Sequence, residues 1–195
     1  MKYKLTRKNR KSVKVFFEDG ITNVYAPKHT NIDFIENAVE KFNKKYQNAI
    51  LKYQEININE YIYIFGEIKN LKNYNLKEIN YSKIKSIFNN FYKDIIINRI
   101  NDLSKKVNVT YTDITFRKLK SRWGSLDSKG RLKFNYLIFM LSPELIDYLI
   151  IHELCHFIEF NHSKQFWITV SLFLPNYKEL RKKLKECNYL IHIYK

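Results

Sequence analysis

One segment limits the possible folds more than any other: an apolar stretch with ionisable residues in its middle. Residues 143–158 are apolar at most positions, all the way round a helix. A helix of this kind is buried in a hydrophobic core. Yet His152, Glu153 and His156 lie inside the stretch, and burying such groups is unfavourable unless they are paired or bind a metal. The conflict between pattern and content predicts a functional site on a buried helix.

The spacing of these three residues predicts metal chemistry. His152 and His156 are one helical turn apart, so both imidazoles project from one face and can bind a single ion. Glu153 lies about 100° further round the helix. It can therefore accept a proton from a metal-bound water without coordinating the metal. This is the H-E-x-x-H zinc-hydrolase pattern, and we expect Zn²⁺ as the cofactor.

A catalytic zinc needs a third protein ligand and one open position. His162 is the leading candidate, and Glu159 is the alternative. If the helix continued, His162 would point about 240° away from His156 and lie about 9 Å further along the axis. We therefore expect the helix to end at about Phe160, with Asn161 in the left-handed region at positive φ.

The rest of the chain alternates between strand and helix patterns. The expected elements are strands at Ser12–Glu18 and Ile21–Ala26, a helix from Thr30 with Asp33 in a capping box, a strand at Tyr61–Phe65, a helix at Tyr81–Val107, a strand at Val109–Phe116 and two strands flanking the Asp127–Gly130 turn. The polar stretch Lys69–Asn80 suggests a boundary between an N-terminal subdomain, 1–78, and a catalytic domain, 79–195. A single continuous domain, 1–195, is the alternative.

Composition restricts location and partners. No signal peptide is visible, the longest central apolar run is too short to cross a bilayer, and 2 Cys give no disulfide framework, so we expect a cytoplasmic protein without a membrane partner. The net charge of +16 includes a basic cluster near the C-terminus with Lys182, Lys183 and Lys185. Such clusters can bind nucleic acid, although A/T-rich codons alone can also enrich a chain in lysine.

Several motifs in a fixed order resemble the YgjP-like metallopeptidase family. They are Val24–Pro27, Arg122-Trp123-Gly124-Ser125, the turn at Ser128–Leu132, Phe134-Asn135-Tyr136, H-E-L-C-H, Asn161-His162-Ser163 and Phe166-Trp167. The resemblance implies an α+β, zincin-like fold: a small antiparallel or mixed sheet packed on a buried active-site helix, with an N-terminal β-hairpin plus helix subdomain. It implies metal-ligand roles for His152, His156 and His162 and the base role for Glu153. Leu126 departs from the family, which usually has a small residue there.

The Arg122–Ser125 motif has two interpretations. Its strand is either an edge on which an extended peptide pairs, or a structural element in which Trp123 packs in the core, Gly124 allows a close backbone approach and Arg122 pairs with an acid. Asn135 either supports the site or holds a turn. Tyr136 and Arg122 are the candidates for stabilising an oxyanion.

Three functions fit these observations. The first is a zinc-dependent peptidase acting on a peptide or protein substrate, the second is a zinc hydrolase acting on a non-peptide amide, and the third is a non-catalytic, metal-stabilised module associated with nucleic acid. Glu153 favours the first two, because a structural zinc has no need of that carboxylate and usually has four protein ligands.

Overall fold

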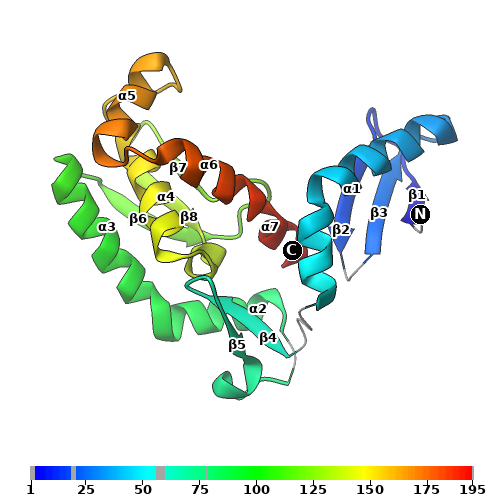
Figure 1. Cartoon of the computed structure of the whole chain (residues 1–195), viewed down its shortest axis with the longest axis horizontal. Coiled ribbons are helices and arrows are strands. Elements are labelled where there is room, and N and C mark those ends of the chain that lie inside the picture. Colours follow the sequence, from blue (N-terminus) through cyan, green and yellow to red (C-terminus); the bar gives the residue numbers. More distant parts are fainter. Residues whose placement is uncertain (1–2, 19–20, 56–59, 78, 195) are drawn as a thin grey trace.

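The computed structural model describes residues 3–18, 21–55, 60–77 and 79–194. The strands are β1 (Tyr3–Arg7), β2 (Lys14–Glu18), β3 (Ile21–Ala26), β4 (Tyr61–Ile64), β5 (Glu67–Asn70), β6 (Asp113–Arg117), β7 (Gly124–Leu126) and β8 (Arg131–Asn135). The helices are α1 (Ile32–Glu55), α2 (Tyr81–Ile87), α3 (Lys93–Val107), α4 (Pro143–Cys155), α5 (Lys164–Phe173), α6 (Tyr177–Glu186) and α7 (Asn188–Ile193). Figure 1 shows a small N-terminal unit beside a larger one.

The N-terminal unit is a three-stranded sheet covered by one helix. The expected hairpin is present as antiparallel β2 and β3, and its turn at Asp19-Gly20 lies outside the described residues. Strand β1, which was not predicted, pairs in parallel with β3. A small core of its own joins sheet and helix, formed by Val24, Ala26, Ile35 and Val39.

The start of α1 corrects the predicted capping box. Asn31, not Thr30, caps the helix: its side chain accepts a hydrogen bond from the Asp33 amide at 3.0 Å, and its carbonyl accepts one from the Ile35 amide at 3.3 Å. Asparagine and threonine are both good caps, so composition alone does not decide between neighbours.

Hairpin β4–β5 belongs to the larger unit. Ile62, Ile64 and Leu71 are buried in its core, and the Phe65 amide donates to the Phe139 carbonyl at 2.7 Å. The polar stretch expected to form a boundary contains β5 and the 3-10 helix Leu71–Tyr74. We therefore propose that the boundary between the two units lies before β4 rather than at residue 78.

The long helix expected at Tyr81–Val107 has the predicted ends. Asn80 caps its start by accepting from the Lys83 amide at 3.0 Å, and Asn108 ends it in the left-handed conformation with φ 59°. Between α2 and α3 the helix passes through the π-helical segment Phe88–Tyr92. Phe88 is completely buried there and packs against Phe116 and Phe139.

The second sheet positions the functional helix. Its order is β6-β8-β7, with β6 parallel and β7 antiparallel to β8, so the sheet is mixed and β7 lies at an edge. Helix α4 packs against β7 and α3. The expected α+β class, with a small mixed sheet on a buried helix, is confirmed.

The last three helices complete the larger unit. Helices α5 and α6 pack on α4, and α7 contacts both β2 and α1 of the N-terminal unit, as seen where the C-terminus lies in Figure 1. Within the described part of the chain, no helix has the length and apolar character needed to cross a membrane.

Candidate metal centre

Helix α4 brings ionisable groups into the middle of the larger core. Pro143 occupies its first turn after Ser142, and the Ser142 hydroxyl makes no capping bond. Cys155 is fully buried, and burial raises the pKa of its thiol to about 12, so it is a core residue that stays protonated. His152 and His156 are only partly buried, because this face of α4 borders a pocket.

The helix ends earlier than predicted, and by a different device. It ends at Cys155 rather than Phe160, because its last turn tightens: the Phe157 amide donates to the Leu154 carbonyl at 3.0 Å. Asn161 does not have a positive φ. Its side chain instead accepts a hydrogen bond from the Ser163 amide at 3.1 Å, an Asx turn that reverses the chain without a left-handed residue.

This reversal brings the three predicted histidines together. One ring nitrogen each of His152, His156 and His162 lies within 4.8 Å of the others. The His152 and His162 Nε2 atoms are 3.0 Å apart. Glu159, the alternative ligand, is not part of this group and contributes its backbone instead: its carbonyl lies 3.1 Å from His156 Nδ1. That contact favours the tautomer protonated at Nδ1, which leaves His156 Nε2 free to bind a metal.

The electrostatics of the cluster fit a cation. Burial, with smaller effects of His156, His162 and Arg181, lowers the pKa of His152 to about 3, and burial also lowers the pKa of His162. Both imidazoles are therefore neutral at pH 7, the form that binds metals. Two facing ring nitrogens 3.0 Å apart need a shared proton or cation between them. His152 Nδ1 is buried and has no hydrogen-bond partner among the described residues.

Aromatic side chains from α5 hold the imidazoles in place. Phe166, fully buried, stacks on His156 with ring centroids 4.5 Å apart. Trp167 stacks on His162 at 5.6 Å and on Tyr177 at 5.4 Å. Phe166 and Trp167 therefore pack against the histidine rings of the site.

Glu153 lies on the sheet side of the cluster. It is only 6% exposed, and burial raises the pKa of its carboxyl to about 8 despite the opposing effects of the Arg122 charge and a hydrogen bond from the Leu126 backbone. The carboxylate fits because residue 124 is glycine: a Cβ there would lie 2.8 Å from Glu153 Oε1. Gly124 thus gives the close backbone approach that one interpretation of its motif required.

A buried asparagine holds the loop before β7. Asn135, 1% exposed, donates from Nδ2 to the Leu119 carbonyl at 2.9 Å and the Arg122 carbonyl at 3.4 Å. Trp123 packs in the core, as expected, and its indole donates to Asn188 at 2.8 Å. The expected acid partner of Arg122 is absent: Arg122 is exposed and makes no ion pair within the described residues.

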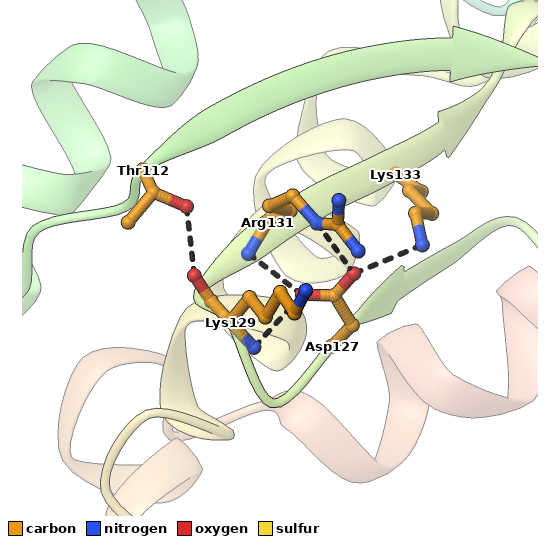
Figure 2. A network of polar contacts seen from close by, with 5 residues as sticks. All are labelled: Thr112, Asp127, Lys129, Arg131 and Lys133. Carbon is orange, nitrogen blue, oxygen red and sulfur yellow. Dashed lines mark hydrogen bonds and ion pairs between the residues drawn. The ribbon is translucent and has the colours of Figure 1, made fainter.

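The turn after β7 is held by one carboxylate. Figure 2 shows Asp127 accepting hydrogen bonds from the backbone amides of Lys129 and Arg131 and from the side chains of Arg131 and Lys133, while the Thr112 hydroxyl donates to the Lys129 carbonyl. These contacts, with Lys133 the strongest, hold the pKa of Asp127 below its usual range. Asp127 is therefore an ionised carboxylate whose charge is balanced by Arg131 and Lys133, and it has a structural role rather than that of a further metal ligand.

A pocket of about 540 Å³ connects these groups. It is lined by residues 121–128, by the histidines and Glu153, and by Tyr148, Leu184 and Asn188. Tyr136, an expected oxyanion candidate, does not line it and packs instead against Tyr81 and Phe88.

Sequence reasoning missed three residues at the site. Tyr148 could have been found, because it precedes His152 by one turn on the same face of α4. Asn188 and Arg181 come from distant helices, and no local pattern indicates them. Arg181 lies 4.3 Å from the centre of the Trp167 ring.

Solved structures similar to this chain include two archaeal metallopeptidase zymogens. Abylysin of Pyrococcus abyssi is 21% identical with a TM-score of 0.43, over 46% of this chain and 90% of its own. Jannalysin of Methanocaldococcus jannaschii is 25% identical with a TM-score of 0.42, over 46% of this chain and 92% of its own. Among curated proteins, none matches the chain.

The family comparison covers most of the larger unit and the candidate metal ligands. Residues 62–187 match the family described as YgjP-like, metallopeptidase domain. The matched segment begins in β4 and extends past α6, so it includes the three histidines, Glu153 and the Arg122–Ser125 motif. The resemblance expected from the motifs is confirmed, and the chain belongs to the YgjP-like metallopeptidase domain family.

Proposed function

We propose that this chain is a zinc-dependent peptidase in which His152, His156 and His162 hold the metal and Glu153 is the general base. The observation that carries the proposal is the convergence of three imidazoles in a pocket, directly beside a buried carboxylate. Family membership supports hydrolysis with a divalent metal and a peptide or protein substrate. Three nitrogen ligands without a fourth protein ligand are typical of catalytic rather than structural zinc.

Zinc bound there would supply Lewis acidity and a coordinated water with a pKa of roughly 7. The protein's part is to remove and redeliver the proton. Burial raises the pKa of Glu153 to about 8, which brings its proton affinity near working pH, where a general base is most effective. A hydrogen bond from the Leu126 backbone partly opposes this rise by favouring the ionised carboxylate.

The edge strand β7 is the proposed docking site for the substrate backbone. The Asn135 amide donates to the Trp123 carbonyl, and the Asp127 amide donates to the Arg131 carbonyl. In an antiparallel pair, successive residues of a strand alternate between those whose backbone groups bond to the partner strand and those whose backbone groups point away from it. The polar backbone groups of Gly124 and Leu126 therefore face away from β8, towards the pocket. Leu126 uses its amide for Glu153, which leaves the backbone of Gly124 to pair with an extended peptide.

The test combines metal analysis with cleavage of a peptide library by wild type and Glu153→Gln. We expect about one zinc per chain in both proteins, with cleavage by the wild type alone, because glutamine preserves the shape of the side chain but accepts no proton. Glu159→Gln, close to the site but outside the ligand group, is the matched control and should retain cleavage. Wild-type rates in Glu153→Gln would refute the base role. A zinc-loaded wild type that cleaves only non-peptide amides would favour the second function.

A further inference from the structure

Two arginines from different elements lie at the pocket and beside it. Arg122 precedes β7 and lines the pocket directly. Arg181 projects from α6, and its guanidinium lies 4.3 Å from the centre of the Trp167 ring, which itself stacks on His162. Both side chains are exposed. The β7 side of the pocket therefore carries positive charge, and Arg181 on α6 places a second charge next to the lining residue His162, through Trp167.

Neither arginine has an ion-pair partner among the described residues, although the Arg122 charge acts on the buried Glu153 carboxyl. The nearby acids are engaged elsewhere: Asp127 binds Arg131 and Lys133, and Glu179 binds Lys183 at 2.8 Å. A bound divalent metal would add to this positive potential.

Arg181 is held in a position suited to recognition. A guanidinium stacked on an aromatic ring keeps its planar donor edge free for a carboxylate. The stacking also restricts the side chain before a ligand arrives, which reduces the entropy lost on binding. Burial raises the pKa of Tyr148, a pocket residue, to about 12, and the charge of Arg181 is close enough to act in the opposite direction.

We propose that the substrates are acidic peptides, in which carboxylates close to the scissile bond bind Arg122 and Arg181. The inference rests on the proposed peptidase function and adds a substrate class to it. Arginine binds carboxylates through two parallel hydrogen bonds, and such charge-assisted bonds are about twice as strong as neutral ones. The same chemistry would recognise an acidic side chain or the α-carboxylate at a peptide's end.

The test compares kcat/KM for matched peptides with blocked ends that carry Glu, Gln or Lys at the positions flanking the scissile bond. We expect zinc-loaded wild type to prefer Glu over Gln by at least about tenfold, mainly through KM, and the preference should shrink as salt screens the charges. A peptide with Gln and a free C-terminus identifies the source: a preference for it alone would assign the carboxylate to the chain end.

Variants are compared by the ratio of kcat/KM for the Glu peptide to kcat/KM for the Gln peptide. A ratio is needed because the Arg122 charge also acts on Glu153, so removing that charge changes the rate for every peptide. The ratio should fall several-fold in Arg181→Gln and approach one in the Arg122→Gln, Arg181→Gln double variant. Lys182→Gln, the neighbouring exposed cation on α6, is the control and should keep the wild-type ratio.

Three results would overturn the proposal. The first is a wild-type ratio near one, which refutes the substrate class but leaves the peptidase function standing. The second is a ratio that survives in the double variant. The third is single-stranded DNA that binds through both arginines while all peptides are cleaved equally, which would assign the charge to nucleic acid. Failure to cleave any peptide at full zinc content would refute the peptidase function as well.

Discussion

Replacing Gly124 by alanine would test whether the sheet positions the general base. The added Cβ would lie 2.8 Å from Glu153 Oε1 and 2.9 Å from Glu153 Cγ, about 0.6 Å inside the 3.4 Å at which ordinary contact begins. Gly124 does not have a positive φ, so alanine suits the backbone and the effect is steric. The carboxylate must move away from β7, and overpacking a buried contact costs about 1–3 kcal/mol.

The expected result is a chain that folds and binds zinc but cleaves slowly. Displacing a catalytic group by about 1 Å lowers rates by about a hundredfold, so we expect kcat to fall by about tenfold to a hundredfold. The assay measures kcat/KM at equal zinc content, with melting temperature recorded in parallel. Ser125→Ala, one residue further along β7 with its side chain on the other face, is the control. Wild-type kcat in Gly124→Ala would refute the reasoning.

Three further predictions concern metal binding and pH. His162→Ala should lower zinc affinity at least about a hundredfold in a chelator competition, whereas Glu159→Ala should retain most of it, because Glu159 contacts His156 through its backbone; equal losses would contradict this. Metal-free Glu153→Gln should gain melting temperature relative to metal-free wild type between about pH 5 and pH 8. Burial raises the pKa of Glu153 to about 8, so wild-type stability falls as pH rises from the unfolded value of about 4.3; a constant difference would contradict this. Asp127→Asn should melt below wild type at pH 7, and the gap should close below about pH 4, because the pKa of Asp127 is lowered in the fold; a gap unchanged at low pH would exclude this ion-pair network as its cause.

Local sequence patterns were sufficient to predict the elements whose formation depends on neighbouring residues in the chain. The β2–β3 hairpin and the helix from Tyr81 to Val107 follow from turn residues and apolar periodicity. Strand β1 depends on parallel pairing with β3, a contact between distant residues that leaves no local signal. Strand β5 is polar, and it forms because Phe65 and Gly66 turn the chain at positive φ and bond to the segment before α4.

The residues of the site also fall into those that local patterns predict and those that they do not. The three histidines and Glu153 share one segment, so helical spacing and a required chain reversal predicted their approach. The predicted end of the helix at Phe160 and the predicted positive φ of Asn161 were both wrong. The helix ends at Cys155, and Asn161 accepts a hydrogen bond from the Ser163 amide through its side chain. Asn188 reaches the pocket, and Arg181 reaches Trp167 beside it, only through the packing of α6 and α7, which no local pattern encodes.

Anomalous diffraction at the zinc edge, from crystals of the zinc-loaded protein, tests the central proposal most directly. The account predicts one ion bound by His152, His156 and His162, with nitrogen distances of about 2.0–2.1 Å and a fourth position open to solvent. Glu153 should lie beside the ion without coordinating it. An ion bound elsewhere, a fourth protein ligand closing the site, or Glu159 in place of His162 would contradict the account.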